Sequence, residues 1–169
     1  MRIAVSTKDG FTMPELMVVI IIVGILSGIA IPTYLRNWED ERLNSAAKYT
    51  LSWLDDLRRS AIQNSTVCRA FIDTSATSLS GICDDKPTAQ RVLDIQQQIP
   101  NASGLTLSLI GTTPATWVFT PRGTTTTDGE LRLALAGSDH GRCITLMKPL
   151  GLLRSGKLRS GLCIYTTSY

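Results

Sequence analysis

The chain has 169 residues, a formal net charge of +3 at pH 7 and 43% hydrophobic residues. This length suits one domain with an appendage. The charge balance is mildly basic, so it does not by itself indicate nucleic acid, a membrane surface or an acidic substrate as the partner.

The hydrophobic residues are concentrated near the N-terminus. No charged residue occurs from Leu16 to Ile31, a run of 16 residues. The run lengthens to 22 residues when it is counted from Phe11 to Pro32 with Glu15 included. Because about 20 residues span the hydrocarbon core of a bilayer, we predict a transmembrane helix over this range.

The order of residues around this run differs from that of an ordinary secretory leader, in which a small-residue cleavage site follows the apolar region. Here the small residue, Gly10, stands before the run, and no Ala-x-Ala follows Ile31. Cleavage after Gly10 would remove residues 1–10 and leave the apolar helix attached. The carboxylate of Glu15 then lies at the start of the apolar run, where an ionised group marks a candidate functional site.

Residues 10–16, which read GFTMPEL, resemble the processing site of type IV prepilins and of the pseudopilins of type II secretion. The resemblance implies that prepilin peptidase cuts between Gly10 and Phe11 and methylates the new amino terminus at Phe11. It implies a single-pass protein of the inner (plasma) membrane that later enters a periplasmic or extracellular filament with other pilin or pseudopilin subunits. Gly24 and Pro32 also stand where many pilins carry Gly and Pro.

Glu15 then has a specific interpretation. In a filament of such helices, the carboxylate of one subunit would meet the α-amino group of Phe11 in its neighbour, and this pairing would make burial of the charge tolerable. Glu15 would set the register of assembly. The alternative is that its side chain only reaches toward the lipid headgroups.

A second helical pattern follows Pro32, because apolar residues recur at steps of three and four. The stripe consists of Leu43, Ala46, Ala47, Thr50, Trp53, Leu54, Leu57 and Ala61. We predict one helix from about Thr12 to about Gln63, roughly 75–80 Å long, with a kink at Pro32 and an amphipathic half over residues 33–64. A coiled coil is the alternative for this half.

From residue 65 to residue 169 the sequence pattern is that of a β-rich domain. Short runs in which apolar and polar residues alternate are separated by turn residues. The expected strands are Val67–Ile72, Leu105–Ile110, Thr116–Phe119, Glu130–Leu135, Cys143–Met147 and Leu162–Tyr165. Residues 92–99 fit a strand or a short helical turn equally well. The predicted fold class is α+β, a long N-terminal helix packed on an antiparallel sheet.

The four cysteines lack C-x-x-C spacing and lie after the apolar run, which favours two disulfides in an oxidising compartment. Cys68 and Cys83 bracket a predicted hairpin symmetrically, so they would face each other across two strands. Cys143 and Cys163 would form the other bridge, although four cysteines allow three connectivities.

The C-terminal region resembles the GspH/FimT class of minor pilins and pseudopilins. The similar segments are Trp117–Gly123, Gly129–Leu133, Cys143–Leu146 and Gly151–Gly156. They match the W-x-F-x-x-x-G strand and turn of that class, a following strand and a final hairpin. The resemblance implies a subunit at or near the filament tip.

No pattern for catalysis is present. The only histidine, His140, lies in the polar run GSDHGR, and no nucleophile, base and orienting group can be named. We predict no enzymatic activity, no cofactor and no metal site.

Residues 141–169 contain no acidic residue and five basic ones, which suggests double-stranded DNA as a partner. The basic residues are Arg142, Lys148, Arg154, Lys157 and Arg159. The last three are expected on a mobile Gly- and Ser-rich loop. Some FimT-type minor pilins bind DNA in natural transformation near this turn; Arg154 fits its second arginine, while Leu152 replaces the first. The alternatives are a solvated loop or a contact to a neighbouring subunit.

Overall fold

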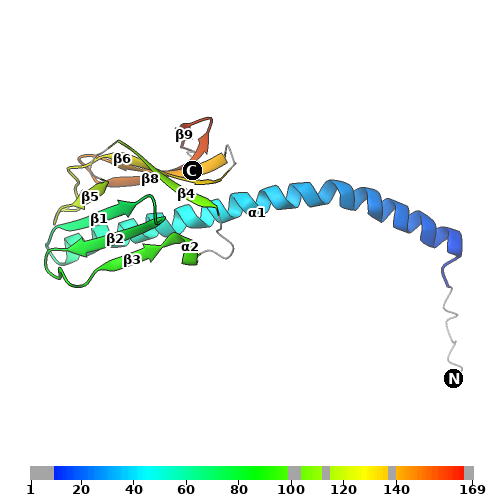
Figure 1. Ribbon diagram of the computed structural model, residues 1–169, viewed down its shortest axis with the longest axis horizontal. Helices are drawn as coiled ribbons and strands as arrows, with labels where there is room; N and C mark the ends of the chain where they lie inside the picture. Colours follow the sequence, from blue (N-terminus) through cyan, green and yellow to red (C-terminus); the bar gives the residue numbers. More distant parts are fainter. Residues whose placement is uncertain (1–9, 99–103, 112–114, 137–139, 166–169) are drawn as a thin grey trace, which may run out of the picture. The chain divides into compact units, whose positions relative to one another are not determined.

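The computed structural model describes residues 10–98, 104–111, 115–136 and 140–165. It divides into two compact units, Met1–Trp38 and Glu39–Tyr169. Helix α1, Met13–Gln63, runs through both (Figure 1). The predicted helix is therefore confirmed to within one residue at its start. The boundary between the units falls inside the segment expected to be amphipathic.

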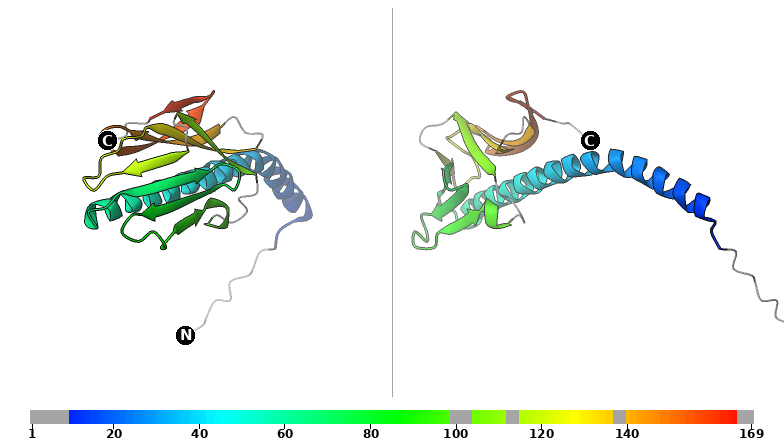
Figure 2. Two further views of the ribbon diagram at one scale, coloured as in Figure 1. Left: turned by 60° about the vertical axis from the view of Figure 1, so that its left-hand side comes forward. Right: turned by 45° about the vertical axis from the view of Figure 1, so that its right-hand side comes forward.

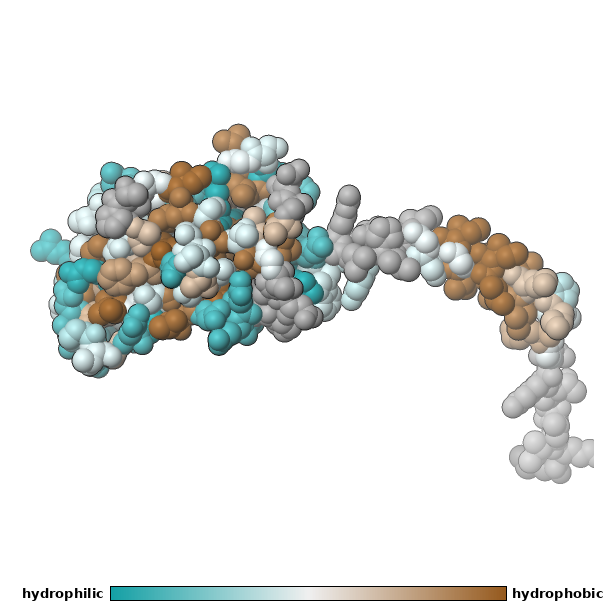
Figure 3. Space-filling model, viewed as in Figure 1, coloured by the Kyte–Doolittle hydropathy of each residue, from teal (hydrophilic) through white to brown (hydrophobic). Residues whose placement is uncertain are grey.

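In the first unit, the described side chains of α1 from Met13 to Gly28 are exposed. Most of them are aliphatic, and Figure 3 shows this stretch as mainly brown and tan, with paler patches. A helix that is apolar on every side requires a lipid or protein environment around it. Ser27 does not break this surface, because its Oγ donates to the carbonyl oxygen of Val23 at 2.7 Å.

Among the residues that the structure describes, no helix combines the length and the apolarity needed to cross a membrane.

The predicted span covers residues 11–32. The side chains of residues 29–32 lie outside the described part of the chain. The span therefore stays a prediction. Helix α1 is continuous through Pro32, and the predicted kink there also stays a prediction.

In the second unit, the predicted apolar stripe of α1 faces the core. Leu43, Ala46, Leu54, Leu57 and Ala61 are buried. Thr50 is also fully buried, and its hydroxyl is satisfied because Oγ1 donates to the carbonyl oxygen of Ala46 at 2.8 Å. Figure 2 shows both β-sheets lying along this half of the helix. The amphipathic interpretation is confirmed, and the stripe packs against sheets of the same chain.

Sheet A has four antiparallel strands in the order β3-β2-β1-β5. They are β1 Cys68–Asp73, β2 Ser78–Cys83, β3 Arg91–Asp94 and β5 Thr116–Phe119. The region that fitted a strand or a helix contains both, β3 followed by the short helix α2, Ile95–Gln98. Asp94 ends the strand and begins the helix, because its Oδ1 accepts from the backbone N–H of Gln96 at 3.0 Å.

Sheet B has five antiparallel strands in the order β4-β6-β7-β8-β9. They are β4 Leu105–Gly111, β6 Gly129–Leu135, β7 His140–Met147, β8 Leu152–Arg159 and β9 Leu162–Ile164. Inward-facing leucines alternate along β6, where Leu131 and Leu133 are fully buried. The α+β class with a helix packed on antiparallel sheets is confirmed.

Strand β8 corrects one expectation. The run LRSGKLR was predicted to form a mobile loop because of its Gly and Ser, but all eight residues of β8 pair with β7. The glycine has a packing role: a Cβ on Gly156 would lie 3.0 Å from Cys163 Sγ and 3.1 Å from Cys143 Sγ. The disulfide between Cys143 and Cys163 thus passes over β8 at Gly156.

Both predicted disulfides are present. Cys68 lies directly opposite Cys83 in the β1–β2 pair, with their Cα atoms 4.0 Å apart. Cys143 in β7 joins Cys163 in β9, with Cα atoms 6.0 Å apart. The first bridge closes a hairpin, and the second joins strands that lie on either side of β8.

Candidate assembly site and basic surface

The predicted cleavage site lies on a short segment before α1. Gly10, Phe11 and Thr12 have no regular secondary structure, and the side chain of Phe11 is strongly exposed. A Cβ built on Gly10 would meet no atom within 4 Å. The peptide bond between Gly10 and Phe11 is therefore unobstructed by the described residues.

Glu15 lies in the first turn of α1 and contacts Thr12. Its Oε2 accepts from the backbone N–H and from the hydroxyl of Thr12, each at 3.4 Å. The carbonyl oxygen of Thr12 in turn accepts from the N–H of Leu16 at 3.1 Å. This is one half of a capping box, in which a Glu three residues after the cap reaches back to the backbone N–H of the cap residue. The hydroxyl of Thr12 adds a second contact to the same carboxylate.

This capping contact was not predicted from the sequence, although the T-x-x-E spacing of residues 12–15 indicates it. It holds the carboxylate of Glu15 one helical turn from Phe11. The same oxygen that caps α1 is the group that was predicted to meet the amino terminus of a neighbouring subunit. That intermolecular role stays a prediction.

The structure separates the five basic residues that were predicted to bind DNA. Arg142 is only 9% exposed, and its Nη2 lies 3.0 Å from Oδ1 of Asp40 on α1. The register explains this: Arg142 pairs with Leu133, whose side chain faces the core. Cross-strand partners share a face of the sheet, so Arg142 faces the helix and is unsuited to a phosphate contact.

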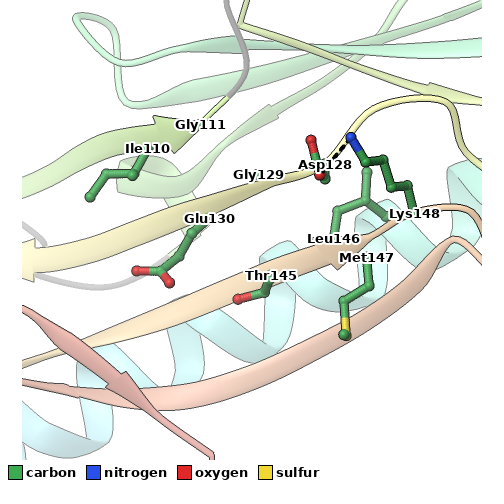
Figure 4. Close-up of a pocket in the computed structure, with 9 residues that line it drawn as sticks. All are labelled: Ile110, Gly111, Asp128, Gly129, Glu130, Thr145, Leu146, Met147 and Lys148. Carbon is green, nitrogen blue, oxygen red and sulfur yellow. Dashed lines mark ion pairs between the residues drawn. The ribbon is translucent and has the colours of Figure 1, made fainter.

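Lys148 is also paired. Its Nζ lies 3.1 Å from Oδ2 of Asp128, and both residues line an open pocket of about 520 Å³ on sheet B (Figure 4). Figure 4 shows Glu130 and Thr145 on neighbouring strands at the same pocket. Glu130 forms an ion pair with Arg132. The charged groups of the pocket, Asp128, Glu130 and Lys148, are thus each engaged in an ion pair.

The three remaining basic residues lie on opposite faces of β8. Arg154 pairs with Thr145, whereas Lys157 pairs with Arg142, and successive side chains of a strand point to opposite faces. The guanidinium of Arg154 lies 5.0 Å from the ring centroid of Tyr165, within cation–π range. Exposed Lys157 and Arg159 form a separate pair on the other face.

His140 was expected in a polar loop. The structure places it instead at the start of β7, exposed and opposite Arg159. Within the described ranges, no three His, Cys, Asp or Glu side chains are grouped so that they could hold a metal ion.

Comparison with known proteins identifies the N-terminal segment. Residues 6–31 match the family described as the prokaryotic N-terminal methylation motif. The match includes the predicted cleavage site, Glu15 and the apolar run. The chain therefore carries this motif, as the GFTMPEL resemblance predicted.

Solved structures with a similar fold include the type IV minor pilin FimU of Pseudomonas aeruginosa, at 20% identity and a TM-score of 0.54 over 69% of this chain and 89% of that one. The minor pseudopilin EpsH from the Type 2 Secretion System of Vibrio cholerae matches at 19% identity and a TM-score of 0.54, over 68% of this chain and 95% of that one. These likenesses show that the chain has the fold of both.

A curated relative, a fimbrial protein of Moraxella nonliquefaciens, is 34% identical over 77 residues. The aligned part is 46% of this chain and 47% of the relative, so the chain spans about half the length of the curated relative that it matches. Motif and fold together confirm the predicted likeness to type IV pilin-like proteins.

Proposed function

We propose that this chain, which carries the methylation motif and the fold of a pilin-like protein, is a minor subunit of a type IV pilus or of a type II secretion filament. Prepilin peptidase cuts it between Gly10 and Phe11 and methylates Phe11. The subunit is held in the inner membrane by a single apolar helix, then enters a filament with other pilin or pseudopilin subunits.

One observation carries this proposal. A glycine, a lone carboxylate and an aliphatic surface follow one another at the start of a helix whose other half packs on a folded domain. A helix that only stabilised the domain would need no exposed aliphatic half. The likenesses to FimU and EpsH have the same TM-score of 0.54, so the fold supports pilus and secretion filament equally.

Glu15 supplies the register in this proposal. In the isolated chain its carboxylate caps α1 through Thr12. In the filament it pairs with the α-amino group of Phe11 in a neighbouring subunit, because a carboxylate buried among apolar helices needs a cationic partner. Cleavage is the step that creates this partner.

Intact-mass spectrometry of the protein from its own cells tests the proposal. The expected mass begins at a methylated Phe11, and no cysteine reacts with an alkylating agent under non-reducing conditions. A Gly10→Val variant should retain residues 1–10 and keep its fold, since a side chain at Gly10 meets no described atom within 4 Å. A native chain that retains residues 1–10 would remove the filament mechanism.

DNA binding in natural transformation is the second candidate. It is supported by exposed Arg154, Lys157 and Arg159 on β8, with no acidic residue between positions 141 and 165. Arg154 lies on the opposite face of the strand from Lys157 and Arg159. The usable surface is smaller than the sequence suggested, because Arg142 is buried against Asp40 and Lys148 is paired with Asp128.

A further inference from the structure

Two aromatic side chains lie together on the first unit. Tyr34 and Trp38 are one helical turn apart on α1, with ring centroids separated by 6.1 Å and ring planes inclined by 35°. They are 63% and 51% exposed. Trp38 is the last residue of its unit. The pair is therefore a surface feature of the helix.

The position of the pair along the helix fits the thickness of a bilayer. At 1.5 Å per residue, Tyr34 stands about 27 Å and Trp38 about 33 Å along α1 from Leu16, where the apolar run begins. The hydrocarbon core of a bilayer is about 30 Å thick. With Leu16 at one boundary of the core, the two rings fall on either side of the other boundary.

The polarity of the chain changes at the same place. Immediately after Trp38 come three acidic residues, Glu39, Asp40 and Glu41, and all three are exposed. Carboxylates are strongly disfavoured in hydrocarbon, so the helix must be in water from Glu39 onward. The aromatic pair thus brackets the polar residues Arg36 and Asn37 and stands between the apolar run and the acidic residues.

Tyr and Trp suit this boundary chemically. Each has a large apolar ring and one polar group, the hydroxyl of Tyr34 and the indole N–H of Trp38, which can hydrogen-bond to headgroups while the ring body lies among the acyl chains. Both residue types are enriched at membrane–water interfaces for this reason. Two rings on one face of a helix also fix its rotation about its own axis.

We infer that Tyr34 and Trp38 form an anchor that seats in the lipid headgroup layer and sets the depth of the membrane-bound subunit, with Glu39 held in water. The inference rests on the proposed membrane-anchored state. Beyond that state, the inference specifies where the helix leaves the lipid and which two side chains determine this position. When the subunit enters a filament, the rings lose their lipid contacts.

Depth-dependent quenching of tryptophan fluorescence tests the anchor. The full chain is reconstituted into phosphatidylcholine–phosphatidylglycerol vesicles in which the acyl chains are brominated either close to the headgroup or near the bilayer centre. The fluorescence that a Trp38→Phe variant lacks belongs to Trp38. A Trp53→Phe variant is the matched control, because Trp53 packs against the core of the second unit. Flotation of the vesicles on a density gradient measures membrane binding separately.

The anchor predicts that the chain floats with the vesicles and that shallow bromines quench the Trp38 component about twofold more than deep ones. The Trp53 component should respond to neither. Stronger quenching by deep bromines, or equal fluorescence in all vesicles with the chain still floating, would overturn the anchor while leaving membrane insertion intact. A chain that does not float would instead contradict the proposed membrane-anchored state itself, and the anchor with it.

Discussion

The guanidinium of Arg58 on α1 joins two turns of the β-rich unit, because its Nε donates to the carbonyl oxygen of Gly123 at 2.8 Å. Its Nη2 also lies 3.5 Å from the carbonyl oxygen of Leu150. The turns touch, because a Cβ built on Gly151 would overlap the carbonyl oxygen of Gly123. One arginine thus connects the end of the helix to the turns that follow β5 and β7.

Removal of this contact should destabilise the second unit. An Arg58→Ala variant leaves the Gly123 carbonyl without its donor, and we expect the free energy of unfolding to fall by about 1–3 kcal/mol. Denaturant unfolding of the full chain, followed by tryptophan fluorescence, measures the change. Arg59→Ala is the control, since Arg59 makes only an exposed pair with Asp55, and it should change the unfolding free energy by less than about 0.5 kcal/mol. Equal effects of the two variants would contradict this role of Arg58.

A side chain at Gly156 should overpack the disulfide that crosses β8. The Cβ of alanine would lie 2.7 Å from the carbonyl oxygen of Ile164 and about 3 Å from both sulfurs. We expect Gly156→Ala to cost about 1–3 kcal/mol of unfolding free energy, whereas Ser155→Ala at the exposed neighbouring position should cost less than about 0.5 kcal/mol. Thermal unfolding under non-reducing conditions compares the two. A stable Gly156→Ala variant with an intact bridge would show that β9 moves freely.

Replacement of Glu15 should block assembly without disturbing the folded unit. A Glu15→Ala variant removes the carboxylate that pairs with Phe11 of the neighbour, and an unpaired α-amino group would then be buried in the filament. We expect the variant to be cleaved and to accumulate in the membrane, with incorporation into sheared filaments lost. Ser27→Ala on the same helix should assemble normally, because its hydroxyl only contacts its own backbone. Normal incorporation of Glu15→Ala would remove the register hypothesis.

If DNA is bound, the salt dependence of binding should identify the residues. Lys157 and Arg159 are exposed on one face of β8, and two lost phosphate contacts should reduce the slope of log K against log salt by about 2. Fluorescence anisotropy with a labelled duplex compares the native chain with the Lys157→Ala, Arg159→Ala double variant. A double variant of Lys48 and Arg59, which are exposed on α1 and not on β8, should leave the slope unchanged. Absence of any binding by the native chain at low salt would exclude this second candidate.

The turn between β1 and β2 should make stability depend on pH. The hydroxyl of Ser75 and then the backbone N–H groups of Ala76 and Ser75 donate to the carboxylate of Asp73 and lower its pKa below the ordinary value of 3.8. The charged form is thus favoured by folding, so its stabilisation is complete above pH 3.8 and is lost as the pH falls through the lowered pKa.

Thermal unfolding in a series of acidic buffers measures this effect. An Asp73→Asn variant cannot titrate at this position and should lose less stability between pH 3.8 and lower pH than the native chain. Identical slopes for the two chains would show that the hydrogen bonds of Asp73 do not differ between the folded and unfolded states.

Features that depend on residues close together in the chain were determined by the sequence alone. The order of Gly10, Glu15 and the apolar run is a local pattern, and it identified the methylation motif. The stripe of α1 repeats every three or four residues, so its buried face follows from helical geometry. Cys68 and Cys83 stand at equal distances from a polar turn, and hairpin symmetry placed them opposite each other.

Only the tertiary structure decided which basic side chains share a surface. Which face of β8 meets the helix depends on its register with β7, and a shift of one residue would reverse every side chain. Formation of a strand in place of a loop separates Arg154 from Lys157 and Arg159. The register of β7 with β6 buries Arg142 against Asp40, 102 residues earlier in the chain. The sequence shows how many basic residues the region contains, but it does not show which face of the sheet each one occupies. That depends on strand pairing, which is a contact between distant parts of the chain.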